Sequence, residues 1–349
     1  MKKPFFILLF VVALSSYKGY AQFDSQISNY WAIPAYFNPA YAGQSGNLEA
    51  TILSRMQWVG IKRAPKTTII AADMPIEFLG KVHGIGASMY NDRVGFFSST
   101  VFAGQYAWKK KLFKGDLSLG IQVGYLQQSF DGANKDLLMD IPDSEDHSAE
   151  DEGIPKSKVS GSSIDASFGI FYSKPKWYVG LSVTHLLAPQ LDLGESDSES
   201  GGYYAEIPRS YYFMAGYNIQ LNNPLIELRP SILLKTMEMS SLHVAPDSLS
   251  EKINEEMLKA MMKNFQVDVS LRVLYKKQFS AGLSWRNDDA LKLSLGAKIK
   301  IIEIGYSYDF PISRIVKEST GSHEFYARCI IDLNLNRGKK NKHKSVRIL

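Results

Sequence analysis

Apolar and polar residues alternate along most of this chain. In the segment LSLGIQVGY, residues 117–125, the side chains of Leu119, Ile121 and Val123 fall on one side of an extended backbone and those of Ser118 and Gln122 on the other. A period of two residues is that of a β-strand whose faces meet different surroundings. The alternation recurs in VDVSLRVLY and in LKLSLGAKI, where the apolar set is Leu291, Leu293 and Leu295. The pattern predicts fourteen strands, near residues 48–56, 67–74, 84–91, 98–110, 115–128, 162–172, 176–185, 209–220, 225–237, 265–275, 278–286, 290–300, 301–309 and 323–335.

The connections between these strands differ in length. Those after the even-numbered strands are mostly short, whereas those after strands five, seven and nine are long. This asymmetry is typical of outer-membrane barrels, whose short turns face the periplasm. Strands of about ten residues also match a tilted membrane crossing. Aromatic residues cluster at the strand ends, at Tyr172, Trp177, Tyr178, Tyr211, Tyr212, Trp285 and Tyr308.

These features predict an all-β fold, a transmembrane antiparallel β-barrel of about 14 strands over residues 48–335 with long extracellular loops. Because unpaired backbone groups are costly in hydrocarbon, such a sheet must close on itself. A water-soluble β-sandwich also has alternating strands and is the alternative.

The first 21 residues have the layout of a secretory signal peptide. Lys2 and Lys3 precede an apolar run over residues 5–14, and small residues lead to a cut after Ala21. The protein is therefore expected to be exported. No later apolar run approaches the roughly 20 residues of a membrane-spanning helix. The single cysteine, Cys329, excludes an intramolecular disulfide, so stability must come from packing and backbone pairing.

Residues 22–47 follow neither a helical nor a strand pattern. They contain YFNPAYAGQSG, in which Pro39 disfavours a helical conformation at Asn38, and the glycines Gly43 and Gly46 permit tight bends. The lumen of a barrel of about fourteen strands is too wide for its own side chains to fill. We therefore predict that residues 22–47 form an irregular plug or brace at the periplasmic mouth. The motif positions are Asn38, Pro39, Ala40, Tyr41, Ala42 and Gly43.

Catalytic and metal-binding signatures are missing from the sequence. The histidines are scattered without ligand spacing, and there is no H-E-x-x-H, G-x-S-x-G or P-loop motif. The fragment GIGASM at Gly84 lacks the third glycine of a dinucleotide fingerprint and lies in a strand pattern, so it indicates thin packing. The sequence thus predicts no enzyme, no cofactor and no metal site. The formal charge of +5 falls to about +2 once the signal peptide is removed, which argues against nucleic-acid binding.

Two long connections have distinctive compositions. The one over residues 129–161 is rich in Asp and Glu and is expected to be a solvated extracellular loop, with calcium binding or a partner surface as alternatives. The segment DSLSEKINEEMLKAMMKNF predicts a helix, with Ser248 and Glu251 as a capping box and a methionine-rich face. This face is expected to pack on the barrel rim, with contact to a partner or cargo as the alternative.

The chain ends in a basic tail, residues 336–349, that contains almost no apolar residues. An even number of strands returns the chain to the side from which it entered, so the tail is predicted to be periplasmic, with the N-terminus on the same side. It can remain disordered, bind anionic lipid, or dock on an acidic partner. The candidate partner-binding residues are Arg337, Lys339, Lys340, Lys342, Lys344 and Arg347.

The N-terminal third of the chain resembles a known family. The QFDSQISNYWAIPAYFNPAYAG segment, the RMQWVGIKRAPKT stretch with ADMP after it, and GIGASMYNDRVGFF are similar to the PorP/SprF family of Bacteroidetes outer-membrane proteins. This resemblance is best over residues 22–132 and continues more loosely to residue 335. It implies a component of the type IX secretion system, which exports proteins with a C-terminal sorting domain and supports gliding motility in some bacteria. The implied partners are outer-membrane lipids, periplasmic ring and lipoprotein subunits, and secreted cargo or a surface adhesin.

Another function class is also compatible with the residues. Fourteen-stranded long-chain fatty-acid channels carry an N-terminal hatch with an Asn-Pro-Ala turn, which Asn38-Pro39-Ala40 resembles. The alternative is therefore an outer-membrane channel or transporter for small or hydrophobic molecules. A transporter should have a continuous pore or an apolar lumen pocket, whereas a secretion component can be plugged. A soluble surface adhesin is the third class, and membrane fractionation separates it from the other two.

Overall fold

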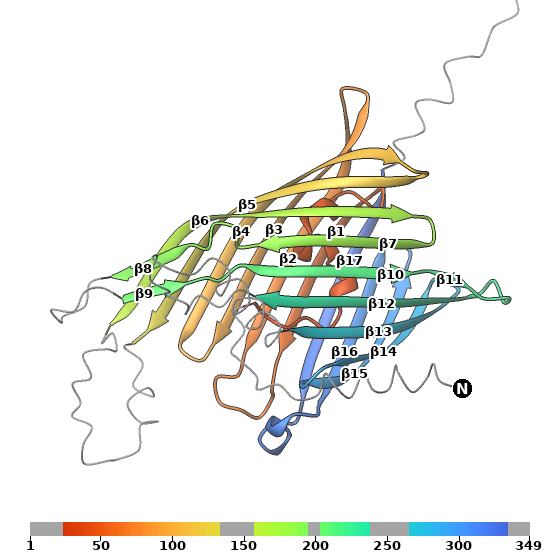
Figure 1. Ribbon diagram of the computed structural model, residues 1–349. Coiled ribbons are helices and arrows are strands. Elements are labelled where there is room, and N and C mark those ends of the chain that lie inside the picture. Colours follow the sequence, from red (N-terminus) through yellow and green to blue (C-terminus); the bar gives the residue numbers. More distant parts are fainter. Residues whose placement is uncertain (1–23, 133–156, 195–202, 238–264, 334–349) are drawn as a thin grey trace, which may run out of the picture.

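The computed structural model is a closed antiparallel β-barrel and describes residues 24–132, 157–194, 203–237 and 265–333 (Figure 1). The strands are β1 (Asn47–Met56), β2 (Lys66–Phe78), β3 (Lys81–Val94), β4 (Phe97–Leu112), β5 (Gly115–Asp131), β6 (Lys158–Lys174), β7 (Trp177–Thr184), β8 (Gln190–Gly194), β9 (Tyr203–Glu206), β10 (Ser210–Tyr217), β11 (Ile219–Gln220), β12 (Ile226–Met237), β13 (Gln266–Tyr275), β14 (Phe279–Arg286), β15 (Ala290–Ile299), β16 (Ile302–Pro311) and β17 (Ser322–Asp332). A short 3-10 helix, η3 (Arg314–Lys317), lies between β16 and β17.

Fourteen long strands close the barrel, each paired with its neighbours in chain order. The first and last strands meet, with Asn47 opposite Asp332 and Met56 opposite His323. Around the ring β7 pairs with β10 and β10 with β12, while β11 adds two residues beside β12. Each predicted strand corresponds to one of these fourteen, so the barrel prediction is confirmed.

The hairpin of β8 and β9 was not predicted. Its apolar residues Leu191, Leu193 and Ile207 form a small buried cluster with Leu126, on the inner face of β5. A Cβ atom at Gly161 would lie 2.3 Å from the carbonyl oxygen of Asp192, so the hairpin backbone lies directly against β6. The hairpin therefore covers the inner face of the wall near the long connections.

The two faces of the wall differ as the alternation predicts. Ile121 and Val123 of β5 are 53% and 56% exposed, and Leu291, Leu293 and Leu295 of β15 are also exposed. The residues between them point inward, and Lys292 and Ser294 are buried. A barrel with an apolar outside and a polar inside is suited to lipid around it and polar groups within it. Two of the aromatic residues at the predicted strand ends, Tyr178 and Tyr212, face the lumen and not the lipid.

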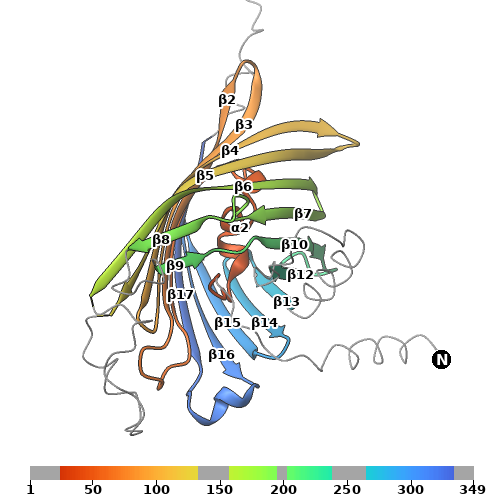
Figure 2. The same ribbon diagram turned by 60° about the vertical axis from the view of Figure 1, so that its left-hand side comes forward.

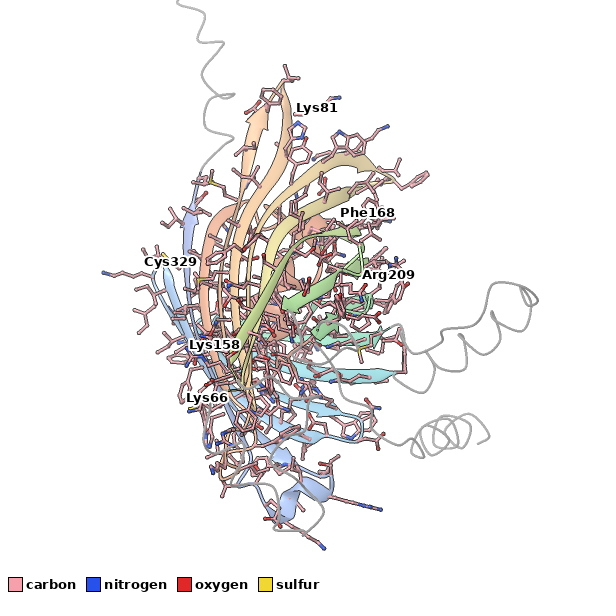
Figure 3. The ribbon with its side chains drawn as sticks, turned by 90° about the vertical axis from the view of Figure 1, so that its left-hand side faces the viewer. Lys66, Lys81, Lys158, Phe168, Arg209 and Cys329 are labelled. Carbon is pink, nitrogen blue, oxygen red and sulfur yellow. The ribbon has the colours of Figure 1, made fainter. Side chains whose placement is uncertain are left out.

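The two ends of the barrel are distinct. Turns of a few residues join β2 to β3, β4 to β5, β6 to β7, β13 to β14 and β15 to β16, and all of them lie at one end, the short-turn mouth. The long connections lie at the other end, the long-loop mouth. Figure 3 shows Lys81 at the first end and Lys66 and Lys158 at the second. None of the helices within the described ranges is long and apolar enough to span a membrane.

Residues 24–46 lie inside the barrel (Figure 2). They include the short helices η1 (Tyr30–Ala32), α2 (Pro34–Phe37) and η2 (Pro39–Tyr41). Their side chains dominate the main core cluster, where Tyr30, Ile33 and Phe37 are each 3% exposed and pack with Tyr90 and Tyr212 of the wall. The hydrophobic core of this protein is thus the contact between the segment and the inner face of the barrel.

Candidate functional site: the lumen segment

The segment over residues 24–46, called the lumen segment below, runs from the long-loop mouth to the short-turn mouth. Its first described residue, Asp24, contacts His185, which directly follows β7 at the long-loop mouth. Ser28 contacts Arg55, the second-last residue of β1. At the other end, Gly43 donates its N–H to Asp73, and the chain enters β1 at Asn47. The lumen segment therefore extends along the lumen rather than lying only at one mouth.

The motif NPAYAG crosses the inner wall along a row of small residues. Strand register places Gly84, Ala107, Gly120, Gly169 and Ser182 opposite one another in turn, on β3, β4, β5, β6 and β7. The row continues to Pro75 on β2. No bulky side chain projects from these positions, so backbone can approach the wall closely. We call these six residues the small-residue row.

The contacts along this row leave no room for a Cβ atom. A Cβ at Gly169 would lie 2.0 Å from Oδ1 of Asn38, and one at Gly120 would lie 2.1 Å from the backbone nitrogen of Ala40. At Gly84 the carbonyl oxygen of Ala42 would be only 1.8 Å away. Real Cβ contacts are not this short, so each glycine is needed for the segment to lie where it does. At Gly84, where the sequence predicts thin packing, the wall backbone is thus in direct contact with Ala42 of the motif.

Asn38 fixes the turn and joins it to the wall. Its Oδ1 accepts the N–H of Ala40 at 2.9 Å and caps η2, and Pro39 occupies the first position of that helix. Its Nδ2 donates to the carbonyl oxygens of Ile170 and Leu181 at 3.0 and 3.1 Å. Asn38 is fully buried, so these bonds replace those that it would make with water.

The other motif positions are also placed by contacts. Ala40 and Ala42 are fully buried, and the ring of Tyr41 meets that of Phe171 edge-on, with the centroids 5.3 Å apart. Gly43 has a φ of +65°, a conformation that favours glycine, and its amide lies 2.7 Å from a carboxylate oxygen of Asp73. The structure thus brings all six predicted motif residues together on the inner wall. The tail residues Arg337, Lys339, Lys340, Lys342, Lys344 and Arg347 lie outside the described residues, as do the acidic stretch 133–156 and most of the predicted methionine-rich helix.

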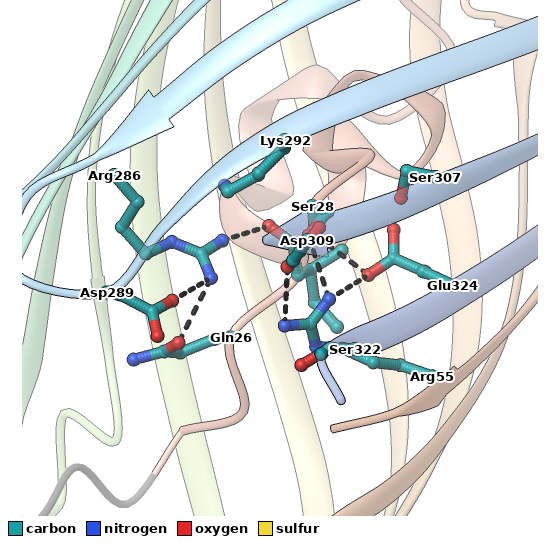
Figure 4. A network of polar contacts seen from close by, with 12 residues as sticks. Gln26, Ser28, Arg55, Arg286, Asp289, Lys292, Ser307, Asp309, Ser322 and Glu324 are labelled. Carbon is teal, nitrogen blue, oxygen red and sulfur yellow. Dashed lines mark hydrogen bonds and ion pairs between the residues drawn. The ribbon is translucent and has the colours of Figure 1, made fainter. Parts of the chain in front are cut away.

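A network of buried charges holds the first half of the lumen segment (Figure 4). Glu324 accepts the backbone N–H groups of Ser28 and Asn29 at 2.8 and 2.6 Å. Asp309 accepts the Ser28 hydroxyl, and Arg55 bridges Asp309 and Glu324 at 2.8 and 3.3 Å. Arg55, Asp309 and Glu324 are at most 2% exposed. Buried charges are costly unless all their bonding groups are paired, and here the segment supplies part of the pairing.

A second group of charges binds the backbone of the segment. Arg286 donates to the carbonyl oxygen of Ile27 at 2.8 Å and forms ion pairs with Asp268 and Asp289 at 3.0 Å each. Lys292 also pairs with Asp268. These wall residues form ion pairs with one another, and Arg286 also donates a hydrogen bond to the lumen segment. Removing the segment would therefore leave Arg286 without that hydrogen bond.

The start of the described segment is anchored at the long-loop mouth. One oxygen of Asp24 lies 3.0 Å from Nε2 of His185, and the other accepts the hydroxyl of Tyr212 at 2.6 Å. Burial alone would raise the pKa of Asp24. The nearby charges of Lys235 and His185 outweigh this effect of burial and hold the pKa of Asp24 well below its usual value. Burial also lowers the pKa of His185, but Asp24 and Asp165 outweigh it and raise this pKa to about 9. At neutral pH the imidazolium and the carboxylate therefore form an ion pair.

Sequence reasoning missed these anchoring residues. Arg55, Asp309 and Glu324 occupy inward positions of their strands, and charges there are the one signal that could have marked them. Their grouping depends on β1, β16 and β17 being neighbours, which follows only from barrel closure.

The arrangement defines a class of protein: a membrane β-barrel whose lumen is occupied by its own N-terminal segment. The chain belongs to the family described as "Type IX secretion system membrane protein PorP/SprF", whose model matches residues 19–329. Barrel and family together place the protein in the outer membrane as a component of this secretion system.

Comparisons with individual proteins are less informative about this chain than the family match. No curated protein matches the chain. Among solved structures, BamA of Haemophilus ducreyi lacking POTRA domains 1–3 matches at 8% identity and a TM-score of 0.41, over 82% of this chain and 70% of that one. A FadL homologue of Pseudomonas aeruginosa matches at 10% identity and a TM-score of 0.41, over 82% and 88% of the two chains. The CymD monoaromatic hydrocarbon channel matches at 11% identity and a TM-score of 0.40, over 82% and 87%. Similarity at this level says nothing about what this chain does.

Proposed function

We propose that this protein is a non-enzymatic component of the type IX secretion system that supports the export or surface anchoring of proteins with C-terminal sorting domains, gliding adhesins among them. Membership of the family supports the secretion role. The observation that favours an accessory over an open channel is the lumen segment, which packs against the inner wall and occupies part of the space that a transported molecule would use. Its motif fits the small-residue row so closely that we take the occupied lumen to be the working state.

We further propose that the short-turn mouth faces the periplasm, as in other outer-membrane barrels. Asn47 and Asp332 are paired at this mouth, so the barrel wall begins and ends on the periplasmic side. The basic tail then begins where periplasmic secretion subunits are accessible. In this orientation Asp24 lies toward the cell surface. A periplasmic location for the residues that precede it stays a prediction.

Deletion of residues 22–42 tests the role of the lumen segment. We expect the barrel still to insert, because its fourteen strands pair with one another, while secretion of sorting-domain proteins falls and conductance in planar bilayers rises. A flexible Gly/Ser segment of the same length, in place of residues 22–42, serves as the control for spacing. Loss of insertion in both variants would mean that the segment acts in assembly, and unchanged secretion would contradict the proposed role.

The second candidate, a channel for small or hydrophobic molecules, predicts a different outcome. A channel gated by its segment should take up solutes in intact cells without any effect of the segment on secreted proteins. Uptake that depends on this protein, with normal secretion in a strain that lacks it, would favour the channel.

A further inference from the structure

A cavity of about 490 Å³ opens at the short-turn mouth. The lumen segment forms its floor through Tyr30, Trp31 and Pro34. Phe171, Trp177 and Tyr178 line one side, and Phe171 and Tyr178 are stacked with their ring centroids 5.5 Å apart. Concave sites of this size with aromatic walls are typical of pockets for small molecules.

The cavity carries an excess of positive charge. Its lining includes six basic residues and only two acidic ones, Glu49 and Glu303. Both acidic residues form ion pairs with the same arginine, Arg328. Its guanidinium nitrogens lie 3.6 Å from a carboxylate oxygen of Glu49 and 2.6 Å from one of Glu303. The remaining basic residues of the lining are Lys174, Arg229, Arg272, Lys277 and Lys298.

Arg272 stands out among them. It is half-buried, lies opposite Arg229 in the register of β12 and β13, and makes no ion pair with any residue in the described ranges. Its Nε has no hydrogen-bond partner there, and its guanidinium lies over the ring of Trp31, 4.6 Å from the centroid. Arg229 pairs with Glu227 at 2.7 Å. Like charges on opposed residues disfavour each other, so this arrangement costs stability unless an anion lies between them.

The rim of the cavity extends the positive potential outward. Exposed lysines lie in or next to four of the short turns at this mouth: Lys81 at the start of β3, Lys110 and Lys111 near the end of β4, Lys114 between β4 and β5, Lys176 between β6 and β7, and Lys276 and Lys277 between β13 and β14. The exposed acids Glu77 and Asp332 lie at the same mouth, so the lysines outnumber the acids there without forming a ring of one sign. An excess of one charge sign around a low-dielectric opening attracts counter-ions toward it. The rim thus favours entry of anions over cations.

We propose that this cavity binds a small organic anion with a flat aromatic body and a carboxylate or phosphate end. The oxyanion accepts hydrogen bonds from Arg272 and Arg229, whose planar forks suit two-oxygen acceptors. The aromatic body lies beside Trp31 and Tyr178. Since Trp31 belongs to the lumen segment, such a ligand stabilises the segment in its seated position. This inference does not depend on the proposed role in secretion.

Binding is tested on the mature protein in non-ionic detergent by fluorescence anisotropy of three probes with the same ring attachment: 2-naphthoate, 2-naphthyl phosphate and uncharged 2-naphthol. Both anions should bind saturably and weaken with added salt, and 2-naphthol should bind at least about tenfold more weakly. Arg272→Gln should weaken the anions by about tenfold or more, because a hydrogen-bonded charge is lost. The stronger of the two anions identifies the preferred end group.

Two variants keep the test decisive. Arg314→Gln makes the same charge change in η3 on the long-loop side and should leave binding unchanged. Arg229→Gln alters the other guanidinium of the opposed pair, whose side chain is 34% exposed, and should weaken binding even where Arg272→Gln lowers the yield of folded protein. Equal binding of 2-naphthol and 2-naphthoate, no saturable binding of either anion, or wild-type affinity in both Arg272→Gln and Arg229→Gln would overturn the proposal.

Discussion

At the scale of single residues, the lumen segment depends on a few positions with little tolerance for change. Asn38 satisfies three groups at once, the amide of Ala40 and the carbonyls of Ile170 and Leu181. Gly169 provides the space in which its side chain lies. Loss of either removes buried hydrogen bonds whose partners cannot reach water while the segment stays in place.

Gly169→Ala should therefore displace the motif from the wall. The added Cβ would overlap Oδ1 of Asn38, so we expect residues 24–46 to become accessible to protease while the barrel stays folded. Asn38→Ala should also increase the protease accessibility of residues 24–46, but to a smaller extent. Gly104→Ala is the matched control, because a Cβ at Gly104 meets nothing within 4 Å. Equal protection in the Gly169 and Gly104 variants would contradict the proposed fit.

The Asp24–His185 ion pair makes the attachment of the lumen segment at the long-loop mouth dependent on pH. The pKa of His185 is raised from 6.5 to about 9, so its contribution is fully present below pH 6.5 and is lost as the pH rises through about 9. The pKa of Asp24 is lowered from 3.8, so its contribution is lost at acidic pH, as the carboxylate becomes protonated. Lys235, Tyr212 and Asp165 complete the surroundings of the pair.

Hydrogen exchange of residues 24–29 measured between pH 6 and pH 10, after correction for the intrinsic rate, should show loss of protection across this window. His185→Gln should give weaker protection and a smaller dependence on pH, since Lys235 still contacts Asp24. A pH profile that is the same for His185→Gln and for the wild type would assign the effect to another group.

At the scale of elements, alternation settles which side of each strand meets lipid. Ile121 and Gln122 are neighbours on β5 at the same height, one exposed on the outer face and the other directed toward the lumen. Ile121→Arg should cost roughly 2–4 kcal/mol of folding free energy in lipid, as expected for an arginine near mid-membrane. Gln122→Arg should cost less, since its charge stays in the polar lumen, although its bond to Gln105 is lost. Equal costs in a denaturant titration in vesicles would contradict the assigned faces.

The elements also show what the sequence could and could not reveal. The alternation predicts all fourteen barrel strands and the faces of β5 and β15, because period two is visible within one strand. Gly84, Gly120 and Gly169 can each be recognised as thin positions, but their alignment into one row depends on register between β3, β4, β5 and β6. The path of the lumen segment and its charge network depend on the same long-range pairing, and only the three-dimensional structure reveals them.

At the scale of the whole molecule, the barrel and its lumen segment share one hydrophobic core and one set of buried polar contacts. The main core cluster contains residues from both, and the buried charges of β1, β16 and β17 are satisfied partly by the segment. The barrel returns the chain to the short-turn mouth at Asp332, from which the basic tail continues.

Truncation after Asn336 tests whether the tail contributes to partner binding. The barrel should stay folded, because β17 ends at Asp332, and co-purification of periplasmic secretion subunits at low salt should fall. Contacts of exposed Lys and Arg are screened over roughly 8–10 Å, so the wild-type interaction should itself weaken with salt. Unchanged partner recovery and unchanged secretion would mean that the tail has no docking role.

The central claim is that the N-terminal segment lies folded within the barrel in the native membrane. The hydroxyl oxygens of Ser25 and Thr67 are 3.0 Å apart, so a Ser25→Cys/Thr67→Cys pair, with Cys329→Ser, is placed to form a disulfide. Oxidation of intact outer membranes should cross-link this pair, detected as a reduction-sensitive shift in gel mobility. It should leave Ser25→Cys/Ser54→Cys uncross-linked, since Ser54 lies on the outer side of β1. Absence of the first cross-link, or its formation in both variants, would contradict the account.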